Sequence, residues 1–153
     1  MYALDNEMHD SVHAIASCGI SPIVRIAANE EWMVKRALDS GAHGVLVPLI
    51  YTADDARRLV ESAKFPPRGK RGFGSPFSMG AFDVKGDLSG LQYMQNANDN
   101  LLTIIQIETA SALADVENIA KIDGIDVRQP LPHCQASRLT LLGTVRGTLG
   151  SRK

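Results

Sequence analysis

Short, continuous apolar segments alternate with longer amphipathic segments along most of this 153-residue sequence. The apolar segments are SPIVRI (21–26), GVLVPL (44–49), LLTIIQI (101–107) and GIDV (124–127). Apolar runs without regular polar interruption are typical of strands that are buried on both faces. Strands of this kind, separated by helices, predict a parallel sheet covered by helices. An open doubly wound sheet and a (β/α)8 barrel both satisfy this pattern.

The segments between the apolar runs carry the signals of helices. Residues 29–41 begin with Asn29 as the predicted N-cap and end at Gly41 as the terminator. Thr52, with Asp55 three residues later, predicts a capping box at the start of a helix over 52–64. Residues 88–99 and 111–122 also favour helices, whereas residues 65–87 are dense in Gly, Pro and Ser and predict a long loop.

Two polar residues interrupt the end of the third apolar run, LLTIIQIE. Because side chains alternate along a strand, Gln106 and Glu108 are expected on one face and Ile105 and Ile107 on the other. In both candidate folds, ligands bind at the carboxyl ends of the strands. Glu108 is therefore a candidate site residue, although the pattern fits equally a carboxylate that makes a cap or an ion pair at the rim of the sheet.

Composition narrows the class of protein. With 44% hydrophobic and 22% charged residues, the chain is expected to be soluble with one core. It has no apolar run of the roughly 20 residues that cross a membrane, and its N-terminus lacks the features of a secretory signal, so a cytoplasmic location is expected. Cys18 and Cys134 have no CxxC spacing, and neither a disulfide nor a zinc site is predicted.

Residues 128–153 differ in kind from the rest of the sequence. They contain no acidic residue, and their five basic residues are spread out with no aromatic residue among them. We expect a divergent basic tail that is poorly ordered. The scattered charges do not favour binding to nucleic acid.

Several segments together resemble the HpcH/HpaI aldolase family. They are SPIVRI, residues 35–75, QNAND (95–99) and residues 104–127, so that the resemblance covers roughly residues 8 to 127. The segments GAHGVLVP, PPRGKRGFGS and QIET follow the order and spacing of the family. The resemblance implies an α/β fold that is part of a (β/α)8 TIM barrel. It also implies metal-dependent cleavage of a 4-hydroxy-2-oxo acid to pyruvate and an aldehyde.

The resemblance also implies roles for individual residues. Glu108 matches a carboxylate ligand of a divalent metal, which would be Mg²⁺ or Mn²⁺, with Co²⁺ as a further option. Arg25 matches an arginine that stabilises the enolate oxygen, and Gln106 matches a residue beside the bound oxo acid. Carboxylate oxygens suit hard cations, and a cation with an arginine can neutralise the charge that develops as a carbon–carbon bond breaks.

The loop RGFGS adds weaker candidates. Gly74 and Ser75 match a loop of the family near the site and are expected to bind substrate, although a simple turn explains them as well. Arg71, at the start of this loop, is a candidate contact for an anionic substrate.

The sequence departs from the family at both ends. The catalytic histidine of the family would precede Met1, and His9 and His13 match no motif and are expected to be helix residues. The second metal carboxylate is also missing, because no Asp or Glu follows Asp126. We therefore expect an incomplete barrel over residues 1–127, truncated at both ends, with impaired activity.

Two functions remain open. The first is an aldolase-type lyase that acts on a small 2-oxo acid, with no nucleic-acid or membrane partner and with the option of a homo-oligomer. The second is a non-catalytic fragment that associates with full-length barrel homologues. A nucleotide-binding module is disfavoured because RGFGS has neither the Rossmann nor the P-loop spacing.

Overall fold

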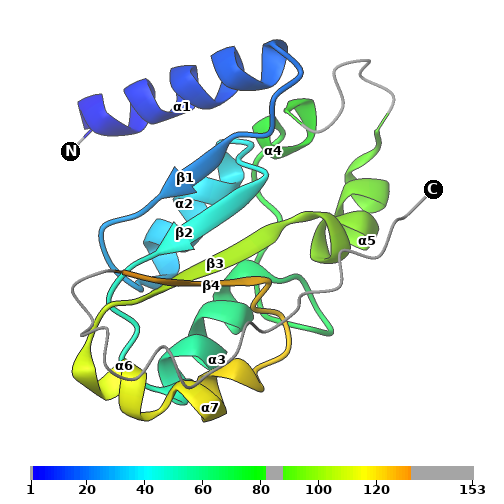
Figure 1. The fold of residues 1–153 in the computed structure, drawn as a ribbon. Helices are drawn as coiled ribbons and strands as arrows, with labels where there is room; N and C mark the ends of the chain where they lie inside the picture. The colour runs from blue at the N-terminus through cyan, green and yellow to red at the C-terminus, as the bar shows by residue number, and fades with distance from the viewer. Residues whose placement is uncertain (1, 82–87, 132–153) are drawn as a thin grey trace.

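The structure is a computed structural model that describes residues 2–81 and 88–131 of the chain. Helices and strands alternate over most of this range (Figure 1). The helices are α1 (Tyr2–Ser17), α2 (Glu31–Asp39), α3 (Ala53–Ala63), α4 (Phe77–Gly80), α5 (Gly90–Asn100), α6 (Ala110–Ala114) and α7 (Val116–Ala120). The strands are β1 (Ile23–Arg25), β2 (Gly44–Val47), β3 (Leu102–Ile107) and β4 (Val127–Pro130).

The four strands form one parallel sheet in the order β1-β2-β3-β4, which confirms the predicted α/β class. Their carboxyl ends lie at the lower left of Figure 1, and α4 and α5 lie near the opposite end. The fourth strand begins at Val127, whereas the sequence pattern placed its start at Gly124. Gly124 instead adopts a positive φ of 91° in the turn before the strand. β4 therefore extends into residues 128–153, the predicted tail. Residues 132–153 lie outside the described residues.

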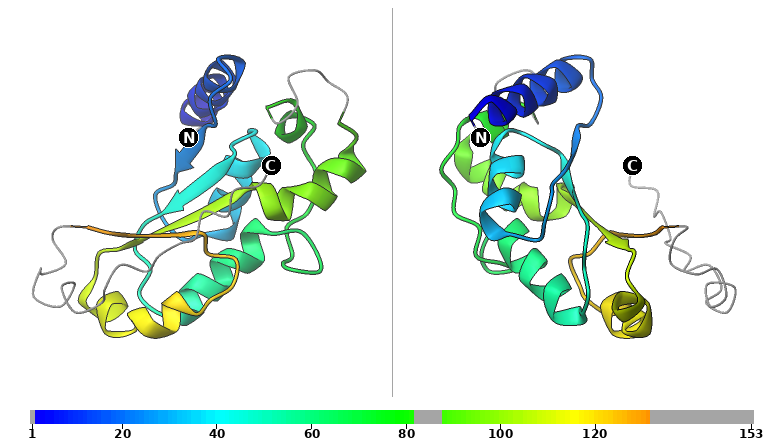
Figure 2. Two further views of the ribbon diagram at one scale, coloured as in Figure 1. Left: turned by 45° about the vertical axis from the view of Figure 1, so that its right-hand side comes forward. Right: turned by 90° about the vertical axis from the view of Figure 1, so that its left-hand side faces the viewer.

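The register assigns side chains to two faces of the sheet. Arg25 pairs with Leu46, Leu46 with Ile104, and Ile104 with Val127, so these four residues share one face. The other face packs on the helices, as the right-hand view of Figure 2 shows for α2 and α3. The core lies between this face and the helices, and it includes Val45, Val47, Ile105 and Ile107 of the strands, Val34, Ala37 and Leu38 of α2, and Ala56 and Leu59 of α3.

The starts of α2 and α3 test the capping predictions. Thr52 and Asp55 form the predicted capping box of α3, since the Thr52 hydroxyl accepts from the Asp55 N–H and the Asp55 carboxylate accepts from the Thr52 N–H. The prediction that Asn29 caps α2 is wrong, because the N-cap is Glu30. The Asn29 side-chain amide instead donates to the carbonyl oxygen of Asp55, at 2.9 Å, and so links the start of α2 to α3.

Gly41 ends the α2 segment as predicted, with a φ of 99°. A Cβ at this position would lie 2.7 Å from the Cβ of Ala81, so a larger residue would also clash. Within residues 2–81 and 88–131, no helix is both long and apolar enough to cross a membrane.

Candidate functional site

Arg25 and Gln106 meet near the carboxyl ends of β1 and β3. The Arg25 Nε donates to the Gln106 Oε1 at 3.1 Å, across the intervening strand β2. Gln106 is buried, whereas Arg25 remains exposed. The hydrogen bond uses the only acceptor atom of the amide, so it orients both the Gln106 amide and the Arg25 guanidinium at the open face of the sheet.

Glu108 follows β3 directly and lies at the same end of the sheet. Its Oε1 accepts a hydrogen bond of 2.6 Å from the backbone N–H of Leu49, which lies just after β2. Leu49 has a positive φ of 56°, an uncommon conformation for a branched residue. This conformation and the short hydrogen bond fix the Glu108 carboxylate between the ends of β2 and β3.

Gly74 and Ser75 lie at the other end of the sheet. The Ser75 hydroxyl donates to the carbonyl oxygen of Asp39, the last residue of α2, at 2.9 Å. α2 leads into the amino end of β2, and the loop continues into α4 near that end (Figure 1). Within the described part of the chain, Gly74 and Ser75 therefore do not share a site with Arg25, Gln106 and Glu108, and their substrate-binding role stays a prediction.

Arg71 is held inside the protein, which does not support the expectation that it meets a substrate. It is 4% exposed, and its Nη2 lies 3.0 Å from the Asp39 Oδ1. Its guanidinium also stacks over the Phe65 ring, 4.6 Å from the centroid, and donates to the Tyr93 hydroxyl at 3.3 Å. Arg71 therefore ties the loop after α3 to the end of α2.

His9 and His13 lie on α1, as expected from the sequence. Their rings stack with centroids 4.8 Å apart, and both make T-shaped contacts with the Phe77 ring in α4. This contact holds α1 against α4 and lies far along the sheet from Glu108.

The described residues do not form a complete site for a divalent cation. No group of three or more His, Cys, Asp or Glu side chains comes together within residues 2–81 and 88–131. Glu108 brings one carboxylate, and one of its oxygens already accepts the Leu49 N–H. A hard cation needs several oxygen ligands in a fixed arrangement, so the donor set of the described residues does not fit the metal on its own.

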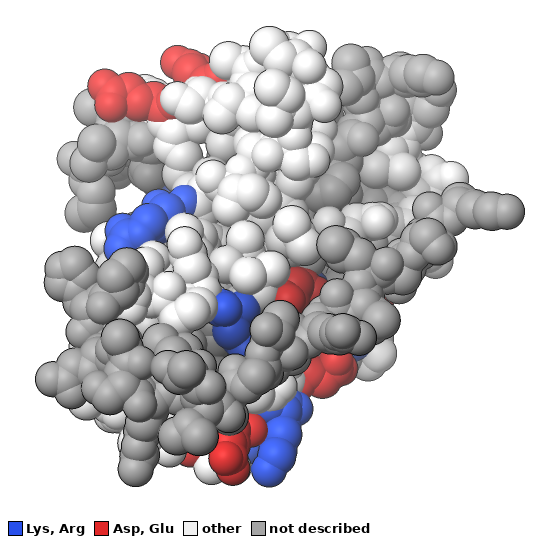
Figure 3. All heavy atoms as spheres, viewed as in Figure 1, with Lys and Arg blue, Asp and Glu red and all other residues white. Residues whose placement is uncertain are grey.

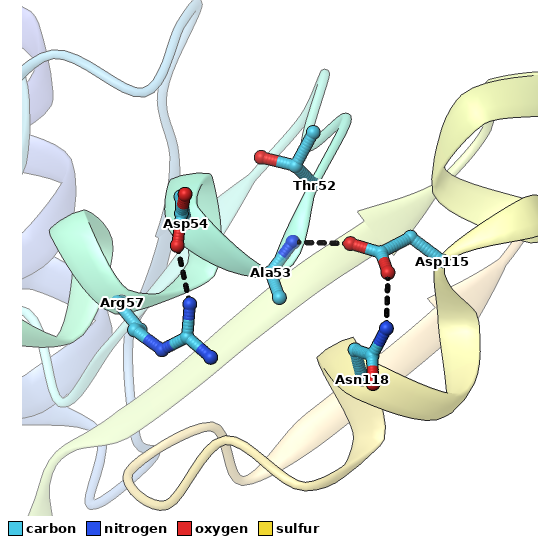
Figure 4. Close-up of a pocket in the computed structure, with 6 residues that line it drawn as sticks. All are labelled: Thr52, Ala53, Asp54, Arg57, Asp115 and Asn118. Carbon is cyan, nitrogen blue, oxygen red and sulfur yellow. Dashed lines mark hydrogen bonds and ion pairs between the residues drawn. The ribbon is translucent and has the colours of Figure 1, made fainter.

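A separate small pocket of about 350 Å³ lies at the start of α3 (Figure 4). Asp115, between α6 and α7, accepts from the Ala53 N–H at 2.8 Å and from the Asn118 side chain at 2.6 Å. These hydrogen bonds, with that from Asn118 first, lower the pKa of the Asp115 carboxyl. No local sequence signal marks this residue, because Asp115 lies within a helical pattern and its partner Ala53 is 62 positions away.

A family model described as HpcH/HpaI aldolase/citrate lyase matches residues 5–129 of the chain. The chain belongs to this family. It is 44% identical over 115 residues to 2-dehydro-3,6-dideoxy-6-sulfogluconate aldolase of Pseudomonas putida, a match that covers 75% of this chain and 43% of that protein. It is 36% identical over 118 residues to hydroxypyruvate/pyruvate aldolase of Agrobacterium fabrum, with 76% and 42% covered.

Solved structures give the same assignment. The HpcH/HpaI aldolase from Desulfitobacterium hafniense superposes with a TM-score of 0.74 at 30% identity, over 91% of this chain and 52% of that one. Macrophomate synthase superposes with a TM-score of 0.71 at 28% identity, over 97% and 50%. The chain therefore forms part of a (β/α)8 barrel. Its match covers less than half the length of the two curated aldolases named above.

Proposed function

We propose that this chain carries part of the active site of an aldolase-type lyase that cleaves a 4-hydroxy-2-oxo acid to pyruvate and an aldehyde. The observation that supports it most is the contact between Arg25 and Gln106, at the strand ends where the Glu108 carboxylate also lies. The aldolase names of the relatives support the reaction class.

The cleavage develops negative charge on one oxygen. A base takes the proton from the C4 hydroxyl, the bond between C3 and C4 breaks, and the aldehyde leaves. The electron pair of that bond forms the enolate of pyruvate, with the charge on the oxygen at C2, and a proton added to C3 then gives pyruvate. The base is not among the residues assigned here.

Arg25 has the chemistry to stabilise the enolate. Its guanidinium is permanently charged and carries five N–H donors, and only Nε is used by Gln106. The remaining donors can hydrogen-bond to the C2 oxygen as its charge grows. The Gln106 amide has two N–H donors for the carboxylate or carbonyl of the oxo acid, so it would both position Arg25 and bind substrate.

The metal remains a prediction from the family, and no step above depends on it. Glu108 would be its carboxylate ligand, and the described residues bring no group of three or more His, Cys, Asp or Glu side chains together. We expect weak binding of Mg²⁺ or Mn²⁺ by a single chain for this reason. The substrate-binding role of Gly74 and Ser75, the cytoplasmic location and a homo-oligomer likewise stay predictions.

Pyruvate release tests the proposal. The purified 153-residue chain is given a 4-hydroxy-2-oxo acid and Mn²⁺, and pyruvate is followed with a coupled assay. We expect slow turnover, and Arg25→Ala should lower kcat/KM by about 100-fold or more, as is typical for loss of a group that stabilises an oxyanion. Arg58→Ala is the matched control, because Arg58 is an exposed arginine on α3 that pairs with Asp55. Absence of turnover from folded protein, or equal activity of the Arg25 and Arg58 variants, would refute the assignment.

The alternative is a non-catalytic fragment that associates with full-length barrel homologues. The exposed face of the sheet favours it, since apolar strand residues there lack a covering layer in the described residues. It predicts that the chain copurifies with a full-length homologue, without releasing pyruvate itself.

A further inference from the structure

Three consecutive connections between a strand and a helix meet at the rim of the sheet that carries the candidate site. Arg25 ends β1, the loop after β2 presents the Leu49 N–H, and Glu108 follows β3. Loops are more mobile than the strands and helices that they connect, and a displacement of about 1 Å can remove much of the effect of a catalytic group. The geometry of the site therefore depends on what holds these loops to one another.

Asn29 holds the loop after β1. It is partly buried, and its side-chain amide donates to the backbone carbonyl oxygen of Asp55, in the first turn of α3, at 2.9 Å. The Asp55 carboxylate in turn accepts from the N–H groups of Tyr51 and Thr52, at 3.0 and 2.9 Å. Asp55 thus receives hydrogen bonds from both loops, so the first turn of α3 fixes the loop after Arg25 against the loop after β2.

Asp115 holds the segment after β3 in a similar way. Its carboxylate is partly buried and accepts the Ala53 N–H at 2.8 Å, and the Asn118 side chain donates to it at 2.6 Å (Figure 4). The Glu108 Oε1 accepts the Leu49 N–H at 2.6 Å. Two hydrogen bonds therefore join the loop after β2 to the segment after β3, one near the strand ends and one at the helix starts.

The face of the sheet that carries Arg25 shows few charged groups among the described residues. Figure 3 views this side of the molecule, and uncharged surface separates the charged groups near its centre. Charge that develops on a bound substrate must therefore be met by a few donors in fixed positions. Movement of Arg25 or of its partner Gln106 would weaken that contact.

We propose that Asn29 and Asp115 are positioning residues of the proposed lyase. Both act through the start of α3. Asn29 fixes the loop that continues from Arg25, and Asp115 fixes the loop that presents the Leu49 N–H to Glu108. Their effect on the reaction rests on the proposed function, whereas the link between these loops does not.

Two isosteric exchanges test these hydrogen bonds. Asp115→Asn keeps an oxygen that can accept the Ala53 N–H, and the Asn118 amide can turn its own oxygen toward the new amide, so the link should persist. Asn29→Asp replaces an amide donor by a carboxylate, which cannot donate to the Asp55 carbonyl at neutral pH, so that link should break. Exchange between the same two side chains thus predicts a retained link at one position and a lost link at the other.

The Leu49 amide proton reports on the link through Asp115 without substrate. In two-dimensional NMR spectra of the full chain, Asp115→Ala should move this signal and increase its hydrogen exchange rate about 10-fold, the factor expected for a lost hydrogen bond. Asp115→Asn should stay close to the wild type. Arg71→Met is the control for a general loss of stability, because Arg71 lies near the opposite end of the sheet, and it should leave the Leu49 signal unchanged.

The Arg25 Nε–H proton serves the same purpose for Asn29. It donates to the Gln106 Oε1, and Asn29→Asp should move its signal and increase its exchange rate about 10-fold. Asn6→Asp is the matched control, since Asn6 is exposed on α1. It makes the same chemical change away from the loops and should leave the Arg25 signal in place.

Pyruvate release then separates positioning from folding. In the assay for the proposed function, Asp115→Ala and Asn29→Asp should each lower kcat about 10-fold and change KM less than about 2-fold, because a displaced donor loses its contact with the charge of the transition state. Asp115→Asn should retain most of the wild-type kcat, and Asn6→Asp all of it. Circular dichroism checks that each variant is folded.

Several results would overturn the inference. An unchanged Leu49 signal in Asp115→Ala, or an equal change in Arg71→Met, would refute the link through Asp115. An Arg25 signal that Asn29→Asp does not move would refute the role of Asn29. A loss of kcat in Asp115→Asn as large as in Asp115→Ala would show that the charge matters and the hydrogen bond does not. A wild-type chain that releases no pyruvate would refute the reaction and the catalytic effect together, while the NMR signals would still decide whether the loops are linked.

Discussion

Two buried cations lie near the amino ends of the strands, opposite to the candidate site. Arg71 pairs with Asp39, and Lys64, which is 1% exposed, donates to the carbonyl oxygens of Asn98 and Leu101 at 2.9 and 3.0 Å. In barrel enzymes the amino ends of the strands serve stability and the carboxyl ends serve catalysis. The buried cations therefore belong to the stability of the fold.

We predict that Arg71→Met lowers the free energy of unfolding by about 2 to 3 kcal/mol. The change breaks a buried ion pair and leaves the Asp39 carboxylate with Lys35 alone. Arg68→Met is the control, because the pair of Arg68 with Asp99 is exposed and should contribute less than about 0.5 kcal/mol. Urea unfolding measures both variants. An equal loss of unfolding free energy in the two variants would show that burial does not determine how much the pair of Arg71 and Asp39 stabilises the fold.

Lys64 gives a prediction about pH. Desolvation by burial lowers the pKa of the Lys64 ammonium below its ordinary 10.5, an effect that Asp126, 4.0 Å away, partly opposes. Between the lowered pKa and 10.5, the unfolded chain binds more protons than the folded chain at this position. Because of Lys64, the free energy of unfolding therefore increases as the pH rises through this window. This increase is lost as the pH falls through the lowered pKa.

Lys64→Met tests this dependence, because methionine keeps the length of the side chain without a titrating group. Urea unfolding of both proteins from neutral pH toward 10.5 should show that the free energy of unfolding of the wild type increases relative to that of the variant. A difference that stays constant over this range would contradict the lowered pKa.

At the scale of elements, Asp115 couples two helices that are distant in the sequence. Its carboxylate accepts the N–H of Ala53 at the start of α3, and its backbone occupies the N-cap position of α7 without a side-chain cap hydrogen bond. Helix N-termini leave backbone N–H groups without partners inside the helix, and a carboxylate satisfies one of them here.

We predict that Asp115→Ala increases the rate of hydrogen exchange at the Ala53 amide. Asp54→Ala is the matched control, since Asp54 carries the same charge in the first turn of α3 but pairs with Arg57. NMR exchange at neutral pH measures both. Because the pKa of Asp115 is lowered from 3.8, its stabilising effect should be present above 3.8 and should disappear as the pH falls through the lowered pKa. An unchanged Ala53 exchange rate would refute the coupling.

At the scale of the whole molecule, one face of the sheet exposes apolar residues within the described residues, and association with a full-length homologue, the alternative function, would cover them. If folding of the chain is linked to that association, Tm must rise as the homologue is added. We expect such a rise for the wild type and a smaller one for Leu102→Lys, which places a charge on this face, in a calorimetric titration with the homologue. A wild-type Tm that does not change when the homologue is added would contradict the association.

The sequence by itself determined the local elements and the class of the fold. Apolar runs place the strands in the sequence, and the Thr52 and Asp55 pair marks the start of α3, because these signals depend on residues a few positions apart. The alternation of these elements also predicts the parallel sheet. Gln106 and Glu108 could be placed at a strand end for the same reason, since alternation along a strand is local.

Only the tertiary structure decided which polar groups face each other. Asn29 binds the carbonyl of Asp55 instead of capping its own helix, and Arg71 turns inward to Asp39 instead of outward to a ligand. The contact between Arg25 and Gln106 joins residues 81 positions apart, across a strand that contributes neither side chain. Such contacts depend on the register and packing of distant segments, which no short stretch of sequence specifies. For the same reason, the open face of the sheet becomes visible only once the strands are placed side by side.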